Sequence, residues 1–195
     1  MNVEPVLVVV HGLPCSGKTT VARRLRQEFG LTFFEKDGVK ERLFDSLGWS
    51  DLDWSRKLSR ASKAVLYYVI EEELKSGHSL GVECNFWPPE DNEHFLAIAS
   101  RVPCSVLQIL CWAPGEELVS RFLGRTGLRH PGHGDQTLLD DIRQYLLQGK
   151  ADPLEIGGEL IELETTYIDE IDYVSLFEKI RRYAPSLAAA SSNRA

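Results

Sequence analysis

The stretch Gly12-Leu13-Pro14-Cys15-Ser16-Gly17-Lys18-Thr19 matches the pattern G-x-x-x-x-G-K-[ST] and decides the fold of this chain. The apolar run at residues 6–10 is typical of a buried β-strand, and the segment from Thr20 has the spacing of an amphipathic helix. A strand, loop and helix in this order direct successive backbone N–H groups toward an anion. Lys18 would reach the outer phosphates of ATP, and the Thr19 hydroxyl would ligate Mg²⁺. The sequence therefore predicts a nucleoside triphosphate site at residues 12–20.

The composition favours one acidic globular domain. The chain has 195 residues, with 22 Lys and Arg against 29 Asp and Glu, and a net charge of −7. Such a charge disfavours binding of nucleic acid, although a local basic cluster would escape the average. The N-terminal apolar run is short and has no basic segment before it, so it indicates neither a signal peptide nor a membrane span. We expect a cytoplasmic protein without a membrane partner.

The four cysteines form no C-x-x-C pair and have mostly apolar neighbours, which favours reduced core thiols. Cys15 has two interpretations, an oxidation-sensitive thiol in the phosphate loop or a small residue that fills it. The other three are Cys84, Cys104 and Cys111.

Strand and helix patterns alternate along the chain, which predicts an α/β fold with a parallel sheet covered on both faces. The predicted strands cover residues 6–10, 31–35, 79–84, 105–112 and 160–164. The predicted helices cover the segment from residue 20 and residues 38–47, 54–75, 116–125, 136–147 and 172–183, with another opening near residue 88. In the long helix 54–75, we expect Leu58, Ala61, Val65, Val69 and Leu74 to form the buried face. One domain would span residues 1–184, and residues 185–195 would form a disordered tail.

Ligands of such sheets bind beyond the carboxyl ends of the strands, so the polar residues found there are the candidate site. Asp37 follows the second strand and could accept the proton of an attacking alcohol, or it could cap the helix that starts at Gly38. Glu83 and Asn85 end the third strand, and Glu83 could act on Mg²⁺ through water or contact the acceptor. Aromatic residues nearby would wall the acceptor pocket or simply pack in the core. These aromatic residues are Phe33, Phe34 and Trp87.

Three arginines enter a segment rich in Gly and Pro after the fourth strand. Arg121 and Arg125 share a helix face, and Arg129 follows them. This pattern predicts a lid at about residues 115–135 that closes over the triphosphate and neutralises the moving phosphoryl group. The alternative is a solvated helix face paired with carboxylates.

Two further groups are weaker candidates. His130 and His133 have a spacing seen in metal sites, but no third ligand is near, so contact with a phosphate or ordinary loop packing is favoured. The residues after the fifth strand would lie at the edge of the adenine. They are Thr165, Thr166 and Tyr167.

The segments GLPCSGKTTVARRL, EKDGVKERL, GVECNF and RFLGR together resemble the small P-loop kinase superfamily, over residues 5–183. The similarity is greatest to the branch of zeta-toxin-like, chloramphenicol-phosphotransferase-like and polynucleotide-kinase-like proteins. The resemblance implies a three-layer α/β/α P-loop NTPase fold with the strand order 2-3-1-4-5. It also implies that Asp37 is the general base, that Lys18 and Thr19 serve the phosphates and Mg²⁺, and that Arg121 and Arg125 are lid arginines.

The chain departs from the polynucleotide-kinase-like pattern at two positions. Lys40 stands where those proteins have an arginine, and Glu83 where they tend to have an aspartate. With the acidic charge, these differences favour a small hydroxylated acceptor over a polynucleotide 5′-end. We therefore expect an ATP-dependent, Mg²⁺-requiring kinase acting on an alcohol. The alternatives are an ATPase or an ATP-binding module without a small-molecule acceptor, or a nucleotide or polynucleotide 5′-hydroxyl kinase. A GTPase is disfavoured because no N-K-x-D motif is present.

Overall fold

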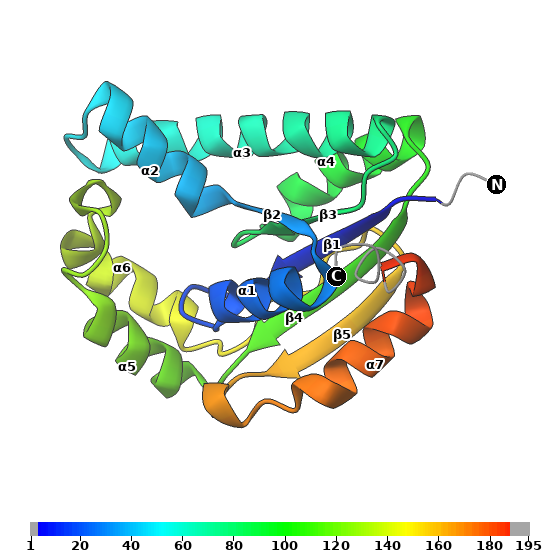
Figure 1. Cartoon of the computed structure of the whole chain (residues 1–195). Coiled ribbons are helices and arrows are strands. Elements are labelled where there is room, and N and C mark those ends of the chain that lie inside the picture. Colours follow the sequence, from blue (N-terminus) through cyan, green and yellow to red (C-terminus); the bar gives the residue numbers. More distant parts are fainter. Residues whose placement is uncertain (1–3, 188–195) are drawn as a thin grey trace.

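Five parallel strands form the sheet of this protein, in the order β2-β3-β1-β4-β5 (Figure 1). The structure is a computed structural model that describes residues 4–187, apart from the side chains of residues 136–141. The strands are β1 (Val6–His11), β2 (Thr32–Glu35), β3 (Leu80–Glu83), β4 (Ser105–Trp112) and β5 (Glu159–Glu164). The three-layer fold and the strand order expected from the resemblance are confirmed. Most of the predicted tail, residues 188–195, lies outside the described residues.

Helices cover both faces of the sheet. The helices are α1 (Lys18–Phe29), α2 (Lys36–Leu47), α3 (Leu52–Lys75), α4 (Pro88–Arg101), α5 (Gly115–Arg125), α6 (Asp135–Leu146) and α7 (Tyr173–Tyr183). On one face, α1 and α7 share a core with β1 and β4, and α3 and α4 form a second core on the other face. A third cluster joins α5 and α6 to Leu13 of the phosphate loop. None of the helices within residues 4–187 combines the length and apolar composition needed to cross a bilayer.

The central strand carries the phosphate loop to the carboxyl edge of the sheet. All six residues of β1 are buried, which explains their continuous apolar run, because β3 and β4 flank the strand and helices cover both its sides. The first turn of α2 begins directly after β2, and β3 ends at Glu83 beside Glu35 in register. The phosphate loop, Glu35 and Glu83 therefore lie together at the carboxyl edge of the sheet.

The predicted buried face of the long helix was wrong in part. Leu58 and Leu74 are buried, but Ala61 and Val65 are exposed. The buried face instead passes through Ser62, whose hydroxyl donates a hydrogen bond to the Leu58 carbonyl oxygen at 2.7 Å. A small serine whose hydroxyl is satisfied by its own helix tolerates burial, so the apolar pattern selected a stripe about one residue away. The residues that α3 buries are Ser55, Leu58, Ser62, Leu66, Tyr67, Ile70 and Leu74.

Candidate active site

The phosphate loop has the backbone conformation that its glycines require. Gly12 has φ of 142°, and a Cβ atom there would lie 2.1 Å from the Cys111 carbonyl oxygen of β4. Gly17 has φ of 78° and precedes the first residue of α1. Cys15, the one non-glycine residue with positive φ in the described chain, has φ of 66°. The loop therefore approaches β4 as closely as backbone allows and ends at a helix N-terminus.

Lys18 lies in this loop as a buried cation. Its Nζ atom donates a hydrogen bond of 2.8 Å to the Leu13 carbonyl oxygen, across the turn. Leu13 is itself fully buried in the cluster formed with α5 and α6. The ammonium group is thus held over the loop, where its charge can meet that of a bound phosphate.

Thr19 and Glu83 place two oxygen atoms side by side next to Lys18. The Thr19 hydroxyl donates to Glu83 Oε2 at 2.9 Å, and the Glu83 side chain is buried. Burial raises the pKa of Glu83, although the charge of Lys18 and the bond from Thr19 act against this rise. Hydroxyl and carboxylate oxygens are ligands that suit Mg²⁺, so these two side chains fit the predicted metal role.

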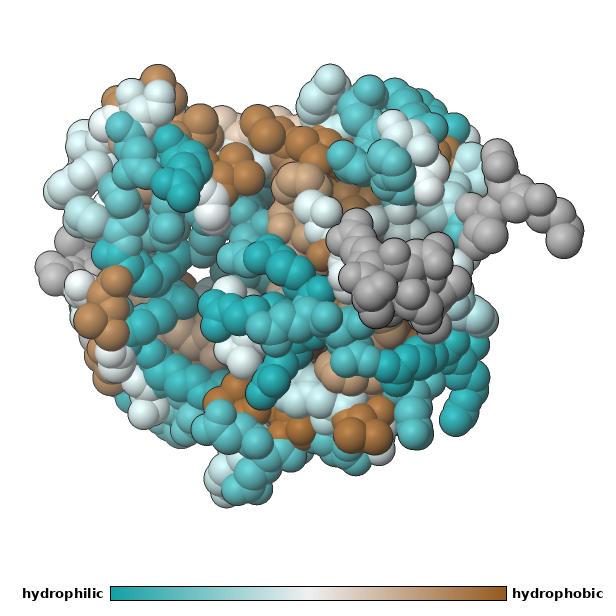
Figure 2. Space-filling model, in the orientation of Figure 1, coloured by the Kyte–Doolittle hydropathy of each residue, from teal (hydrophilic) through white to brown (hydrophobic). Residues whose placement is uncertain are grey.

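The phosphate loop opens into a cavity of about 460 Å³. Figure 2 shows a hollow on this side of the molecule, edged mainly by hydrophilic residues. Residues of the loop, α2, β3 and the lid segment line the cavity together. The predicted site residues among them are Pro14, Cys15, Gly17, Lys18, Thr19, Thr20, Asp37, Glu83, Asn85, Arg121, Arg125, Arg129 and His133. One pocket thus contains the loop, the candidate base and the candidate lid arginines.

Asp37 lies in the first turn of α2 and does not cap it. The helix begins at Lys36 with Glu35 at the N-cap position, so the capping interpretation of Asp37 was wrong. The carboxylate accepts from Lys36 Nζ at 2.9 Å and from the Arg129 guanidinium. Loss of water around the group would raise its pKa, but Lys36 and Arg129 more than offset this and hold the pKa of Asp37 well below its usual range.

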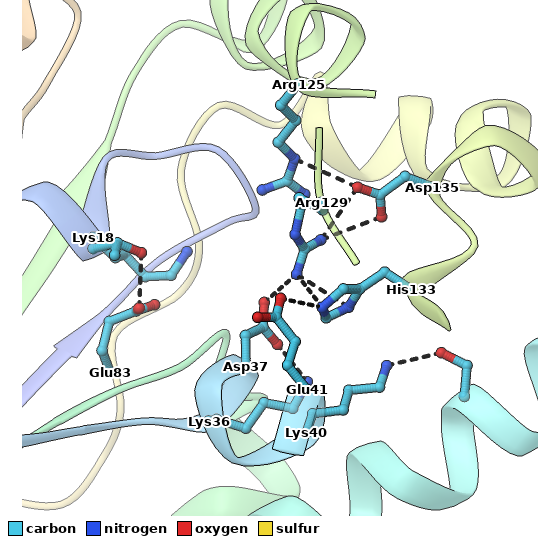
Figure 3. Close-up of polar contacts among 12 residues, drawn as sticks. Lys18, Lys36, Asp37, Lys40, Glu41, Glu83, Arg125, Arg129, His133 and Asp135 are labelled. Carbon is cyan, nitrogen blue, oxygen red and sulfur yellow. Dashed lines mark hydrogen bonds and ion pairs between the residues drawn. The ribbon is translucent and has the colours of Figure 1, made fainter. Parts of the chain in front are cut away.

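The lid segment contacts α2 through Arg129. Besides Asp37, its guanidinium contacts both carboxylate oxygens of Asp135 at 3.2 and 3.3 Å and the His133 ring at 3.1 Å (Figure 3). His133 is buried and its Nε2 lies 2.9 Å from Glu41 Oε1 on α2. Burial and the neighbouring Arg129 lower the pKa of His133. One network of charged and polar side chains therefore connects the predicted lid segment to α2.

The other two lid arginines have separate contacts. Arg125 Nε lies 3.8 Å from Asp135 Oδ2 and is turned toward the cavity (Figure 3). Arg121 donates to the Cys15 carbonyl oxygen at 3.2 Å and to the Thr165 and Thr166 carbonyl oxygens at 2.7 and 2.9 Å. Its Nε also donates to Glu117 at 2.8 Å. Arg121 therefore ties the phosphate loop to the turn after β5, and its role toward a triphosphate stays a prediction.

The aromatic residues expected at the acceptor pocket do not line it. Phe33 is buried in one core and Phe34 packs against the other, so the packing alternative is the correct one for both. Trp87 is 52% exposed, and its ring centroid lies 6.2 Å from that of Tyr145. Strand-end aromatics point into the sheet layers here because both faces of the sheet are covered. Asn85 does line the cavity, as expected.

The remaining candidates serve local packing. The His130 ring stacks on Phe44 with centroids 5.0 Å apart, and no group of three or more His, Cys, Asp or Glu in the described residues could hold a metal. Thr165 is buried and its hydroxyl donates to the Ser16 carbonyl oxygen at 3.0 Å, whereas Tyr167 is 70% exposed. Burial raises the pKa of the Cys15 thiol, which favours its interpretation as a residue that fills the loop. All four cysteines are free.

A second polar cavity of about 220 Å³ adjoins the first. It shares Lys36, Asp37, Glu83 and Asn85 with the larger cavity and extends to Ser59 and Lys63 on α3. Lys63 binds both carboxylate oxygens of Asp91, at 2.8 and 2.7 Å, and Asp91 is fully buried. Ser59 and Lys63 were not among the predicted site residues, because a serine and a lysine on an expected helix do not by themselves indicate a site.

Comparisons with known proteins identify the family of this chain. The model of the AAA domain family matches residues 7–146. A UPF0200 protein of Pyrobaculum aerophilum is 30% identical over 85% of this chain and 92% of its own length, and a cytidylate kinase of Ignicoccus hospitalis is 25% identical over 72% and 76%.

Solved structures have the same fold. A candidate kinase of Chloroflexus aurantiacus is 35% identical, with a TM-score of 0.84 over 93% of this chain and 99% of that one. A sugar kinase of Janibacter is 21% identical, with a TM-score of 0.56 over 95% of this chain and 98% of its own length. The second likeness concerns the fold alone.

Proposed function

Because the chain belongs to the AAA domain family and has the fold of the small P-loop kinases, we propose that it transfers the γ-phosphoryl group of ATP to a hydroxyl group of a small molecule. The observation that carries this proposal is the shared cavity. A phosphate loop with its buried lysine opens into the same 460 Å³ space as the carboxylate of Asp37. A triphosphate in the loop would direct its terminal phosphorus toward that carboxylate.

The proposed reaction is an in-line displacement at phosphorus. The acceptor hydroxyl oxygen forms a bond to the γ-phosphorus while the bond from that phosphorus to the β–γ bridging oxygen breaks, so that ADP leaves. Asp37 accepts the hydroxyl proton as the new bond forms. Lys18 and Arg125 offset the negative charge that spreads over the phosphoryl oxygens.

Thr19 and Glu83 would hold Mg²⁺, which in such reactions neutralises charge on the β- and γ-phosphates. Glu83 is the less ordinary of the two because its carboxyl group is buried. Its raised pKa means that the ionised form needs a cation nearby, and Lys18 already supplies part of that stabilisation.

In the structure Asp37 is engaged by Lys36 and Arg129. A carboxylate held by two cations is a weak base, so the proposal requires Arg129 to leave Asp37 when both substrates bind. A triphosphate offers Arg129 a stronger anionic partner in the same cavity. The lid would thus exchange one anion for another as the reaction begins.

The direct test measures ADP release from protein and Mg-ATP across a library of hydroxylated metabolites and antibiotics, with CMP included because one relative is named a cytidylate kinase. We expect release that depends on one class of acceptor, and ³¹P NMR would identify a phosphomonoester product. An Asp37→Asn protein should bind ATP normally and lose turnover by about 10²–10⁴-fold.

Three outcomes would contradict parts of the proposal. Release that no acceptor changes would indicate an ATPase, and a phosphoanhydride product from CMP would replace the alcohol by a phosphate as acceptor. Full activity in Asp37→Asn would remove Asp37 from the reaction.

A further inference from the structure

Lys40 is a buried cation with no carboxylate contact among the side chains that the structure describes. Its side chain lines the 460 Å³ cavity, and the residue is only 6% exposed. Its Nζ donates to the Ser55 hydroxyl at 2.9 Å and lies 5.2 Å from the centroid of the Phe44 ring. Among the residues that the structure describes, no carboxylate oxygen lies within 4.0 Å of that nitrogen. Such a charge is costly to bury unless an anion joins it.

The neighbouring cations on the same side of the cavity are compensated. Lys36 is paired with Asp37, Arg129 with Asp37 and Asp135, and Lys63 with Asp91. Burial, together with the repulsion of Lys36, lowers the pKa of Lys40 to about 8, as expected for an ammonium group without a full counter-charge. Lys40 is therefore available to an incoming anion.

Its position favours the acceptor over the nucleotide. Lys40 comes three residues after Asp37 on α2, so the two side chains share a helix face with their Cβ atoms about 5–6 Å apart. In Figure 3, Lys18 and Glu83 lie on one side of Asp37, and Lys40 lies on the other side, against α3. A molecule that presents its hydroxyl to Asp37 would bring its next few atoms toward Lys40.

The charged residues that line the two cavities also favour binding of the acceptor at Lys40. Seven lysines and arginines but only three carboxylates line the two adjoining cavities within the described residues. A triphosphate would compensate those at the phosphate loop and lid, which leaves Lys40 on the α2–α3 side. An acceptor at Lys40 would share the 460 Å³ cavity with the terminal phosphates of ATP, so it is compact.

We propose that the acceptor is a small hydroxylated anion, whose carboxylate or phosphate group binds Lys40 while a hydroxyl a few bonds away faces Asp37. This inference rests on the proposed function and names its substrate class. Ser55 keeps the ammonium group oriented, and the ammonium nitrogen lies over the Phe44 ring. A neutral polyol of the same size would leave the Lys40 charge uncompensated.

The test uses the full chain saturated with Mg²⁺ and a non-hydrolysable ATP analogue, so that the phosphate loop is occupied. NMR titrations then follow the binding of glycolate, inorganic phosphate and ethylene glycol, which separate a carboxylate, a phosphate and a neutral diol. We expect saturable binding of one of the two anions and none of the diol. Lys40→Met should weaken that binding by about 10–100-fold, and Lys40→Arg should retain most of it.

Lys57→Met is the matched control, because Lys57 is an exposed lysine on α3 that lines neither cavity. It should leave anion binding unchanged, and the analogue should bind all variants equally. Equal binding of the diol and the anions, no anion binding, or wild-type affinity in Lys40→Met would each overturn the inference while the proposed function stands. Failure of the analogue to bind would contradict the proposed function itself, and the inference would fall with it.

Discussion

Arg129 and Asp37 lie 92 residues apart in the chain and form an ion pair that joins the lid segment to the first turn of α2. The pair lowers the pKa of the candidate base and, with His133 and Glu41, connects the predicted lid segment to α2. The same arginine thus contacts the candidate base and the predicted lid.

Removal of this arginine should raise the pKa of Asp37. In Arg129→Ala the carboxyl keeps Lys36 but loses its second cation, so we expect the pKa of Asp37 to rise toward the ordinary range for aspartate. Carboxyl-detected NMR titration measures the shift directly. Arg42→Ala is the control, because Arg42 is an exposed α2 arginine paired with Asp45. An Asp37 titration that is the same in both variants would show that Arg129 does not act on the base.

The Thr19 hydroxyl should matter more for metal affinity than for nucleotide affinity. Thr19→Val removes a proposed ligand and the hydrogen bond to Glu83, leaving a buried carboxyl without that donor. We expect Mg²⁺ to bind the ADP complex about 10–100-fold more weakly, because a charge-assisted hydrogen bond and a ligand are both lost. Calorimetry with ADP, with and without Mg²⁺, separates the two affinities. Thr32→Val, on the exposed edge of β2, should change neither affinity, and a loss confined to ADP itself would argue against the metal role.

Lys40 should make stability depend on alkaline pH. The pKa of Lys40 is lowered to about 8 in the folded protein, against 10.5 for an ordinary lysine, so between these limits the unfolded chain binds more protons and stability rises with pH. The stability of wild type relative to Lys40→Met should increase across this window by about 1–3 kcal/mol. Urea unfolding at several pH values from 7 to 10.5 measures the difference. A constant difference would mean that Lys40 titrates normally.

Gly12 and Gly124 form a matched pair of glycine substitutions. Gly12→Ala puts a Cβ atom 2.1 Å from the Cys111 carbonyl oxygen at a φ of 142°, so we expect destabilisation of more than about 2 kcal/mol. Gly124 lies in α5 and has no atom within 4 Å of its added Cβ, so Gly124→Ala should stabilise the protein by about 0.5 kcal/mol. Thermal unfolding of both proteins provides the comparison. Equal stability of the two would contradict the close approach of the loop to β4.

Short sequence patterns predicted those parts of the candidate site that consecutive residues form on their own. The phosphate loop, the strand before it and Asp37 after β2 are each set by a few consecutive residues, and the strand order followed from the resemblance. The contacts of Asp37 could not be predicted in this way. Arg129 reaches it only because α5 and the lid fold back over the carboxyl edge of the sheet, and no spacing in the sequence encodes that distance.

Side-chain direction was the least predictable feature. Phe33 and Phe34 lie in the middle of the short strand β2, and both pack in the cores, because each face of the sheet carries helices. Lys40 was noted only as a departure from the polynucleotide-kinase-like pattern, and the sequence did not indicate that it is nearly fully buried. Its burial depends on α3 packing against α2, which places Ser55 at its ammonium group.

The contacts of Arg121 have a consequence for how variants of this chain are read. One guanidinium bridges the carbonyl oxygens of Cys15, Thr165 and Thr166, so two segments about 150 residues apart, the phosphate loop and the turn after β5, both depend on it. Loss of Arg121 would therefore loosen the phosphate loop at Cys15 and the turn after β5 at the same time. An Arg121 variant could therefore be inactive because the site is distorted or because a positive charge near the phosphates is lost. A structure of the variant would separate the two causes.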